Sequence, residues 1–257
     1  RKFWWRLARP CPDVKEALEP LRRFLVTSIV SKHRLFAWHR VPVNPDHALA
    51  VFAREDDCFF GIVHSRFHEV WALKQGTRLE TRPRYTPTTC FETFPFPQPT
   101  PEQETAIAAA AKELNELRER WLNPPEWTVE KFLEFPGSAN GPWARYVVPQ
   151  SKIKNPKSEI GLVRYPRLEP KDADCAKNLK ERTLTKLYNE RPAWLDLAHK
   201  KLDAAVAAAY GFPANLTDEQ ILERLLELNL ARAAAEAKVE KSKFPKISRA
   251  KSEDELI

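Results

Sequence analysis

Hydrophobic and polar positions in the first part of the chain change from the spacing of strands to that of a helix. Three short runs rich in β-branched and aromatic residues, separated by polar breaks, lie at 24–30, 34–41 and 48–54. Such runs predict a small antiparallel sheet. The apolar residues of 56–75 then recur at helical spacing, and Gly76 can cap the end of that helix.

Residues 77–99 carry a different pattern, which is polar and interrupted by prolines. Proline fixes the backbone and removes an amide donor, so it excludes a long helix or a central strand. We therefore expect an ordered loop or short edge strands. The prolines are Pro83, Pro87, Pro95, Pro97 and Pro99.

The rest of the chain is expected to be mainly helical. Thr100, Pro101 and Gln103 form a capping-box signal for a helix that runs to about Leu122. The further predicted segments are a short helix after Thr128, a long connection at 136–174, helices at 178–190, from Pro192 to Gly211 and after Thr217, and a disordered charged tail at 236–257.

These patterns together predict an α+β fold. Residues 1–99 would hold a small antiparallel sheet with helices, and residues 100–235 a mainly α-helical part. No apolar run reaches the roughly 18 residues of a membrane span. The first residues also lack the apolar stretch of a signal peptide. We therefore expect a cytoplasmic location and no membrane partner.

Charge adds a possible partner. The chain has 42 Lys and Arg against 35 Asp and Glu, a net charge of +7, and the excess is concentrated in residues 1–40. A basic face suits a polyanion, although it can also serve only as a solubilising surface.

Glycine content excludes a class of sites. The six glycines fall in no GxG spacing, whereas phosphate loops and dinucleotide-binding turns need glycines that let backbone amides approach the ligand. No cofactor is therefore expected to bind to this chain.

Two short motifs could carry chemistry, but each has a simpler interpretation. The tetrapeptide Asn-Pro-Pro-Glu at 123–126 resembles an amino-methyltransferase loop, yet it lacks the aromatic fourth residue and follows a helix, so we interpret it as a helix stop. His64 and His68 have a metal-compatible spacing, but no third ligand is obvious and Arg66 lies between them. We expect no catalytic residue and no metal, and instead a histidine pair that lines a cleft or faces nucleic acid.

The segment 64–96 is the most informative for function because it mixes cations with hydroxyl groups on a proline-stiffened loop. Arginine can donate two hydrogen bonds to the edge of a guanine, and the hydroxyl groups of Thr and Tyr can contact phosphate or base. A surface loop anchored by its aromatic residues is an equally good interpretation of the residues alone. The candidate DNA contacts are Arg78, Arg82 and Arg84, supported by Tyr85, Thr86 and Thr88, and then His64, Arg66 and His68.

The run FFGIVHSRFHEVWAL, continuing through GTRLETRPRYTPTTCFETFPFP, resembles the target-recognition region of MmeI-like type IIG/IIL restriction–modification DNA methyltransferases. A second block, LTKLYNERPAWLDLAHKKLDAAVAAAYGF, is similar to the C-terminal helical part of the same proteins. The resemblance implies an enzyme that methylates adenine N6 within a short DNA sequence, using S-adenosylmethionine.

In that family the cofactor and catalytic motifs lie N-terminal to the region that this chain resembles, and the chain lacks both. The resemblance thus implies that residues 1–99 recognise double-stranded DNA and work with an N-terminal methyltransferase domain of the same full-length protein. The alternative is a protein-interaction or scaffold module whose helical part docks a partner subunit.

Overall fold

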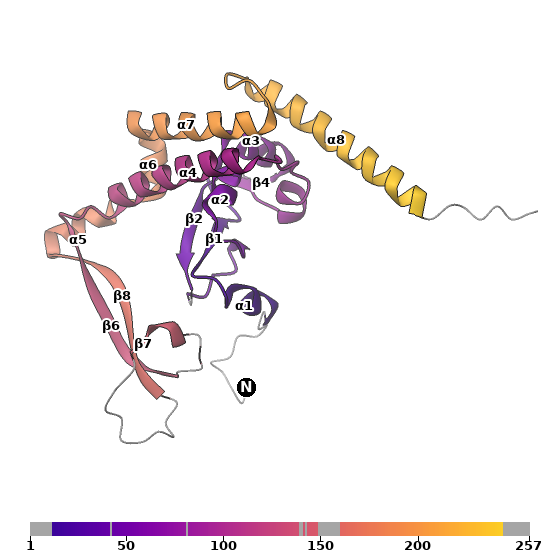
Figure 1. The fold of residues 1–257 in the computed structure, drawn as a ribbon. Helices are drawn as coiled ribbons and strands as arrows, with labels where there is room; N and C mark the ends of the chain where they lie inside the picture. Colours follow the sequence, from indigo (N-terminus) through magenta and orange to yellow (C-terminus); the bar gives the residue numbers. More distant parts are fainter. Residues whose placement is uncertain are drawn as a thin grey trace, which may run out of the picture.

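The computed structural model describes residues 12–41, 43–80, 82–138, 141, 143–148 and 160–243, and it has an α+β fold (Figure 1). Three small antiparallel sheets, of strand order β2-β1-β3, β4-β5 and β6-β8-β7, are combined with helices that dominate the C-terminal part. This confirms the fold class expected from the sequence. None of the helices in this part of the chain has the length and apolar character needed to cross a bilayer.

The first sheet consists of β1 (Arg23–Ser28), β2 (Phe36–Arg40) and β3 (Leu49–Phe52), as the three hydrophobic runs predicted. Its strands alternate between two faces, as extended chains must. Leu25, Phe36 and Phe52 face the main core, whereas Phe24 and Val26 pack with Leu18 of the preceding helix α1 (Pro12–Leu18). Both faces of β1 are therefore covered.

The predicted helix at 56–75 is two helices, α2 (Asp57–His64) and α3 (Arg66–Gln75). Ser65 separates them because its backbone is extended, with φ −73° and ψ 160°. Asp56 caps α2 by accepting a hydrogen bond from the amide of Phe59 at 2.8 Å. Ser65 therefore ends α2 and begins α3, as the C-cap of the first helix and the N-cap of the second.

The proline-rich segment forms the short edge strands that were expected as one possibility. β4 (Thr77–Leu79) and β5 (Arg82–Arg84) pair as a small hairpin, and a single π-helical turn, η1 (Pro87–Phe91), follows. This confirms the absence of a long helix or a central strand there.

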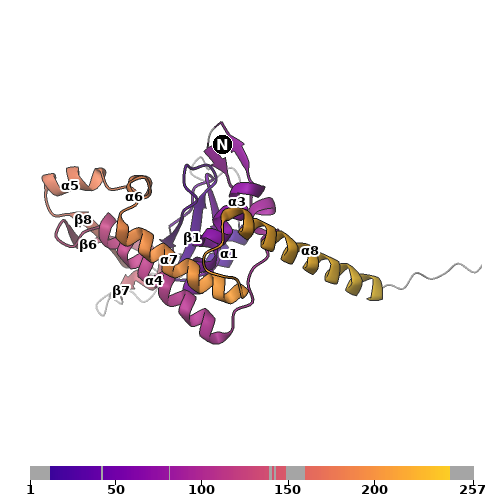
Figure 2. The same ribbon diagram turned by 90° about the horizontal axis from the view of Figure 1, so that it is seen from above.

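Helix α4 (Pro101–Leu122) begins with the predicted capping box, in which Thr100 and Gln103 exchange hydrogen bonds. It crosses α2 closely at Gly61, where an added Cβ would lie 2.7 Å from the side chain of Ile107. Helix α7 (Ala193–Tyr210) lies along α4 in both views (Figure 2). An added Cβ at Gly61 would also lie 3.1 Å from Leu202 of α7. Helices α4 and α7 therefore form one layer, and α2 lies between that layer and the sheet.

The largest departure from the predictions is an arm that extends from the end of α4. The expected short helix after Thr128 is strand β6 (Thr128–Ser138), and the expected connection 136–174 contains β7 (Val147–Val148) and β8 (Ile160–Pro170). β6 pairs with β8 along its whole length, and β8 also pairs with β7. A 3₁₀ turn, η2 (Ala144–Tyr146), precedes β7.

Two further predictions in the C-terminal part were wrong in detail. The helix expected at 178–190 is split into α5 (Ala173–Lys180) and α6 (Leu184–Glu190). The segment 236–243, expected in a disordered tail, belongs to α8 (Asp218–Lys243), and the remainder of the predicted tail, 244–257, lies outside the described residues. The predicted end of α7 is confirmed, because Gly211 adopts the left-handed conformation with φ 68°.

Candidate nucleic-acid interface

The β4–β5 hairpin is attached to the far end of strand β1. The amide of Tyr85 donates to the carbonyl of Ile29 at 2.7 Å, and Val30 forms an isolated bridge with Arg84. Beneath this junction Arg34 is buried, with its guanidinium 4.8 Å from the ring centre of Tyr85. These contacts fix the base of the hairpin and leave its tip projecting from the sheet.

All three predicted arginines of the hairpin are exposed. The register pairs Leu79 with Arg82, Thr77 with Arg84 and Arg78 with Pro83. Directly paired residues share a face of a hairpin, and neighbours along a strand alternate. Arg82 and Arg84 therefore share one face, whereas Arg78 lies on the other. The structure brings two of the three predicted cations together.

Glu80, which was not a candidate in the sequence analysis, lies at the tip of the hairpin between β4 and β5. Its φ of 56° is unusual for a residue other than glycine, and its carboxylate lies 3.3 Å from the guanidinium of Arg82. Both side chains are more than half exposed, so the pair contributes little to stability. A carboxylate beside an arginine presents an acceptor and a donor at one tip, the two functions needed to read base edges. The signal available in the sequence was the alternation of charges in RLETRPR.

The two predicted threonines lie after the hairpin. Thr86 is partly exposed and precedes η1, where its carbonyl accepts a hydrogen bond from the amide of Cys90 at 2.8 Å. Thr88 is exposed within η1. Both residues follow β5 along the chain, and within the described residues no hydrogen bond or ion pair joins either side chain to the arginines of the hairpin.

Tyr85 and His68, predicted as DNA contacts, lie instead in the interior. Tyr85 is 1% exposed and His68 0%. The Tyr85 hydroxyl lies 3.2 Å from His68 Nε2, and His68 Nδ1 donates to the carbonyl of Val63 at 2.8 Å. Burial raises the pKa of Tyr85 and lowers that of His68 to about 3. Each polar group thus has an internal partner, and neither side chain reaches the surface.

His64 is also placed in the core rather than at a surface. Its Nδ1 accepts a hydrogen bond from the amide of Phe36 at 3.2 Å, and its Nε2 lies 3.0 Å from both the Tyr188 hydroxyl and Arg118 Nη1. Burial, with the nearby charge of Arg118, holds the pKa of His64 well below its usual value. The ring nitrogens of His64 and His68 serve separate internal contacts, and no group of three or more metal-ligating side chains gathers within the described part of the chain.

Arg66 is committed to a structural contact. Its guanidinium donates to Asp218 at 2.8 Å and to the carbonyl of Leu216 at 2.8 Å, which joins α3 to the start of α8. Its backbone amide donates to Asp203. Sequence analysis missed this role because the partners lie about 150 positions away.

The Asn-Pro-Pro-Glu motif ends a helix, as predicted. Helix α4 stops at Leu122 with Asn123 as its C-cap, and the carbonyl of Pro124 accepts a hydrogen bond from the Thr128 hydroxyl at 2.9 Å. The turn leads directly into the arm. The motif therefore forms the junction between the helical layer and β6.

Comparison with known proteins agrees with this arrangement. Residues 24–98, which span the first sheet, α2, α3 and the hairpin, match the family described as "MmeI, target recognition domain". The chain is also similar to a solved structure of the Type IIL restriction–modification enzyme MmeI in complex with DNA, with a TM-score of 0.55 and 20% sequence identity. No curated protein matches the chain.

The similarity to the solved structure covers 84% of this chain but 22% of that one, so the chain corresponds to about a fifth of the MmeI chain. It extends beyond residues 24–98 and includes much of the helical part, where the likeness is one of fold. The family match covers the sheet and the exposed arginine hairpin together. Residues 24–98 therefore match the MmeI target recognition domain family, and the likeness of the rest of the chain to MmeI is one of fold.

Proposed function

We propose that this chain recognises a specific DNA sequence as part of a site-specific adenine-N6 DNA methyltransferase of a restriction–modification system. The face of the β4–β5 hairpin that carries Arg82 and Arg84 lies against the edges of base pairs in the major groove. Arg78, Thr86 and Thr88 contact the same duplex around it. A methyltransferase domain, N-terminal in the same full-length protein, supplies S-adenosylmethionine and the chemistry.

The observation that carries the proposal is the exposed, cationic hairpin within a segment of the MmeI target recognition domain family. Within the described residues Arg82 forms an ion pair only with the exposed Glu80. Its guanidinium can therefore release that carboxylate and bind a base at little cost in free energy. The hairpin is short and fixed at its base, so binding would order few additional residues. Tyr85, His64 and His68 are left out of the proposed interface because they are buried.

Replacing Arg82 or Arg84 by alanine is expected to weaken binding to the preferred duplex by about 1–3 kcal/mol and to relax the base preference at one position. Selection of bound duplexes from a pool of random sequences, followed by titration of the preferred one, measures both effects. Arg224→Ala removes an exposed arginine of α8 and serves as the matched control. A base preference that is unchanged in both hairpin variants would exclude this face as the reader.

A second candidate function rests on exposed leucines of the helical part. Leu197 on α7 and Leu226 and Leu230 on α8 are each about half exposed or more. They favour a module that docks a partner subunit. This second function would be supported over the first if the chain associates with a partner protein in a salt-insensitive way and does not bind duplex DNA.

A further inference from the structure

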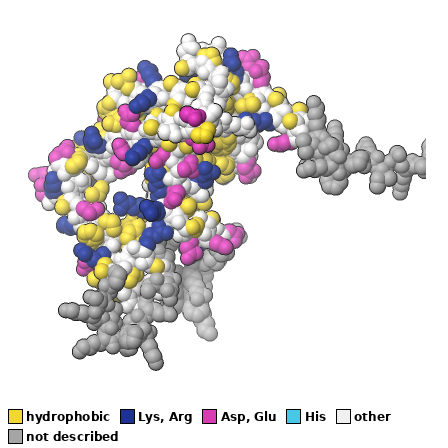
Figure 3. Space-filling model, viewed as in Figure 1, with side chains coloured by type: hydrophobic (Ala, Val, Ile, Leu, Met, Phe, Trp, Pro, Cys, Tyr) yellow, Lys and Arg dark blue, Asp and Glu magenta, His cyan; other side chains and the backbone are white. Residues whose placement is uncertain are grey.

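A second basic site lies at the opposite end of β1 from the hairpin. It is a cleft between the sheet and the arm, lined by Arg22, Arg23, Arg40, Glu55 and Tyr146. Figure 3 shows Lys and Arg side chains gathered around the opening between these two parts of the molecule.

The arm is held against the sheet at this cleft by three hydrogen bonds. The Tyr146 hydroxyl donates to the carbonyl of Val41 at 3.2 Å, and Arg145 donates to the carbonyls of Leu21 and Glu19 at 2.6 and 3.0 Å. Within the described part of the chain Arg145 therefore bonds only to neutral groups and keeps its charge at the rim. The walls of the cleft come from the first sheet and from η2, and their contacts fix their spacing.

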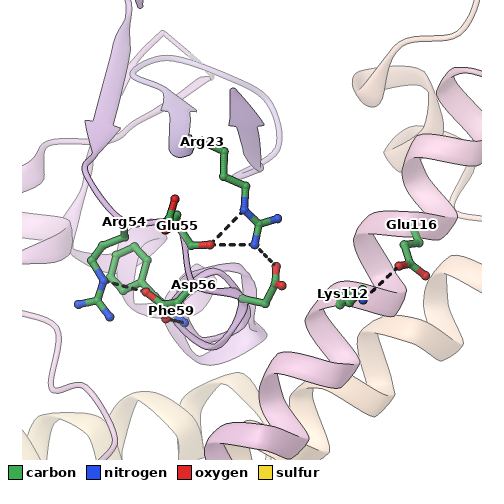
Figure 4. A network of polar contacts seen from close by, with 8 residues as sticks. Arg23, Arg54, Glu55, Asp56, Phe59, Lys112 and Glu116 are labelled. Carbon is green, nitrogen blue, oxygen red and sulfur yellow. Dashed lines mark hydrogen bonds and ion pairs between the residues drawn. The ribbon is translucent and has the colours of Figure 1, made fainter. Parts of the chain in front are cut away.

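One of the lining arginines is already neutralised. The Arg23 guanidinium donates to Asp57 at 2.9 Å and twice to the carbonyl of Glu55, at 3.0 and 2.8 Å (Figure 4). It also lies 3.9 Å from the ring centre of Trp38. The Glu55 carboxylate accepts a hydrogen bond from the backbone amide of Arg22 at 2.8 Å. Of these residues, Arg22, Arg23 and Glu55 line the cleft.

The other two lining arginines have no such partner. The side chains of Arg22 and Arg40 are exposed, and within the described residues neither guanidinium makes an ion pair or a hydrogen bond. Arg40 is the cross-strand partner of Arg23, which is adjacent to Arg22. Arg22 and Arg40 thus bring two unpaired positive charges to one cleft, and such charges repel one another. An anion in the cleft would offset both charges and accept hydrogen bonds from both guanidinium groups.

We propose that this cleft binds the phosphodiester backbone of the duplex whose bases the β4–β5 hairpin reads. The proposal rests on the proposed function and adds a second contact point to it. Arg22 and Arg40 hold phosphate oxygens, with Arg145 at the rim, and they do so for any base sequence.

The spacing of the two sites suits one duplex. Val30, which bridges to the hairpin, lies eight positions after Arg22. An extended chain rises about 3.3 Å per residue, so the two sites are roughly 26 Å apart. A duplex rises about 3.4 Å per base pair, so this distance corresponds to about 8 base pairs. One end of the sheet would then read bases while the other holds the backbone.

The test is the salt dependence of DNA binding by the full chain carrying Arg22→Gln and Arg40→Gln. Each lost phosphate contact reduces the slope of log Kd against log salt concentration by about 0.9, so the double variant should show a slope lower by about 2. Affinity should fall equally for preferred and scrambled duplexes, with the base preference unchanged. Lys200→Gln with Lys201→Gln, on α7, removes the same charge elsewhere and should leave the slope near that of the unmodified chain.

The Arg22→Lys, Arg40→Lys variant keeps both charges and should retain the salt slope. The thermal unfolding midpoints of all variants should agree, because these side chains are exposed.

If the Arg22→Gln, Arg40→Gln variant still binds DNA and its salt slope is unchanged, this inference is overturned and the hairpin proposal is left intact. An equal loss in the Lys200/Lys201 control also overturns it, since general charge would then suffice. An unmodified chain that binds no duplex overturns both proposals.

Discussion

Lowering the pH from 7 to 5 is expected to remove about 3 kcal/mol from the free energy of unfolding. Three histidines are buried in the neutral form. Burial is the main cause that lowers the pKa of each, to about 3 for His68, to about 4 for His199, and well below the usual value for His64. Their unfolded pKa is about 6.5.

The sign of the effect follows from these values. A depressed histidine pKa means that the unfolded chain binds protons first, so stability is complete above about pH 6.5 and is lost as the pH falls toward the folded values. At pH 5 His68 and His199 each cost about 2 kcal/mol, and His64, whose pKa is also lowered by burial, acts in the same direction. Asp203 opposes this, because burial raises its pKa to about 6 and protonation then favours the folded chain by about 1 kcal/mol at pH 5. Glu69, whose pKa burial also raises, acts in the same direction as Asp203.

Urea titrations at pH 7, 6 and 5 measure the loss directly. His199→Gln, which can still hydrogen-bond to Tyr188, should reduce the loss between pH 7 and 5 by about 2 kcal/mol. His47→Gln is the matched control, since the His47 side chain is 95% exposed. Equal stability at pH 7 and 5 would show that the buried histidines do not determine the acid limit.

The parts of the fold that could be predicted from sequence depend on neighbours along the chain. The strands β1, β2 and β3, the capping box at Thr100 and the end of α7 at Gly211 are all specified within a few residues. The arm is different, because β6 pairs with β8 across some twenty to forty positions. Val129, Phe132 and Leu133 stand at the i, i+3 and i+4 positions of a helix and are exposed in the strand. Local spacing therefore favoured the wrong element.

The candidate site could likewise be predicted only where it depends on neighbours along the chain. Arg82 and Arg84 lie on an exposed hairpin, as their charges and the surrounding prolines indicated. The burial of Tyr85 was not predictable, because it depends on a hydroxyl partner that His68 supplies from another element. Sequence chemistry identifies groups that can bind DNA, but only the tertiary packing decides which of them the core has already used.

The packing that carries the hairpin can be tested at Phe60. Phe60 is 0% exposed, and its ring stacks on that of His64 with 5.1 Å between the ring centres. Its ring centre also lies 5.5 Å from that of Trp38 on β2, so Phe60 joins α2 to the sheet. Phe60→Ala should reduce the free energy of unfolding by about 3–5 kcal/mol, because it removes buried apolar surface and leaves a cavity.

Phe132→Ala makes the same chemical change on the arm, where the ring is 48% exposed and lies against Arg164. Its loss should be about 1 kcal/mol or less, since half of that ring is already in water and its cation–π contact is exposed. Urea unfolding of both variants at pH 7 gives the comparison. Equal losses would mean that α2 and the sheet do not form the stabilising centre of the fold. The expected difference would instead identify the contact between α2 and the first sheet as that centre, because Phe60 packs there against Trp38.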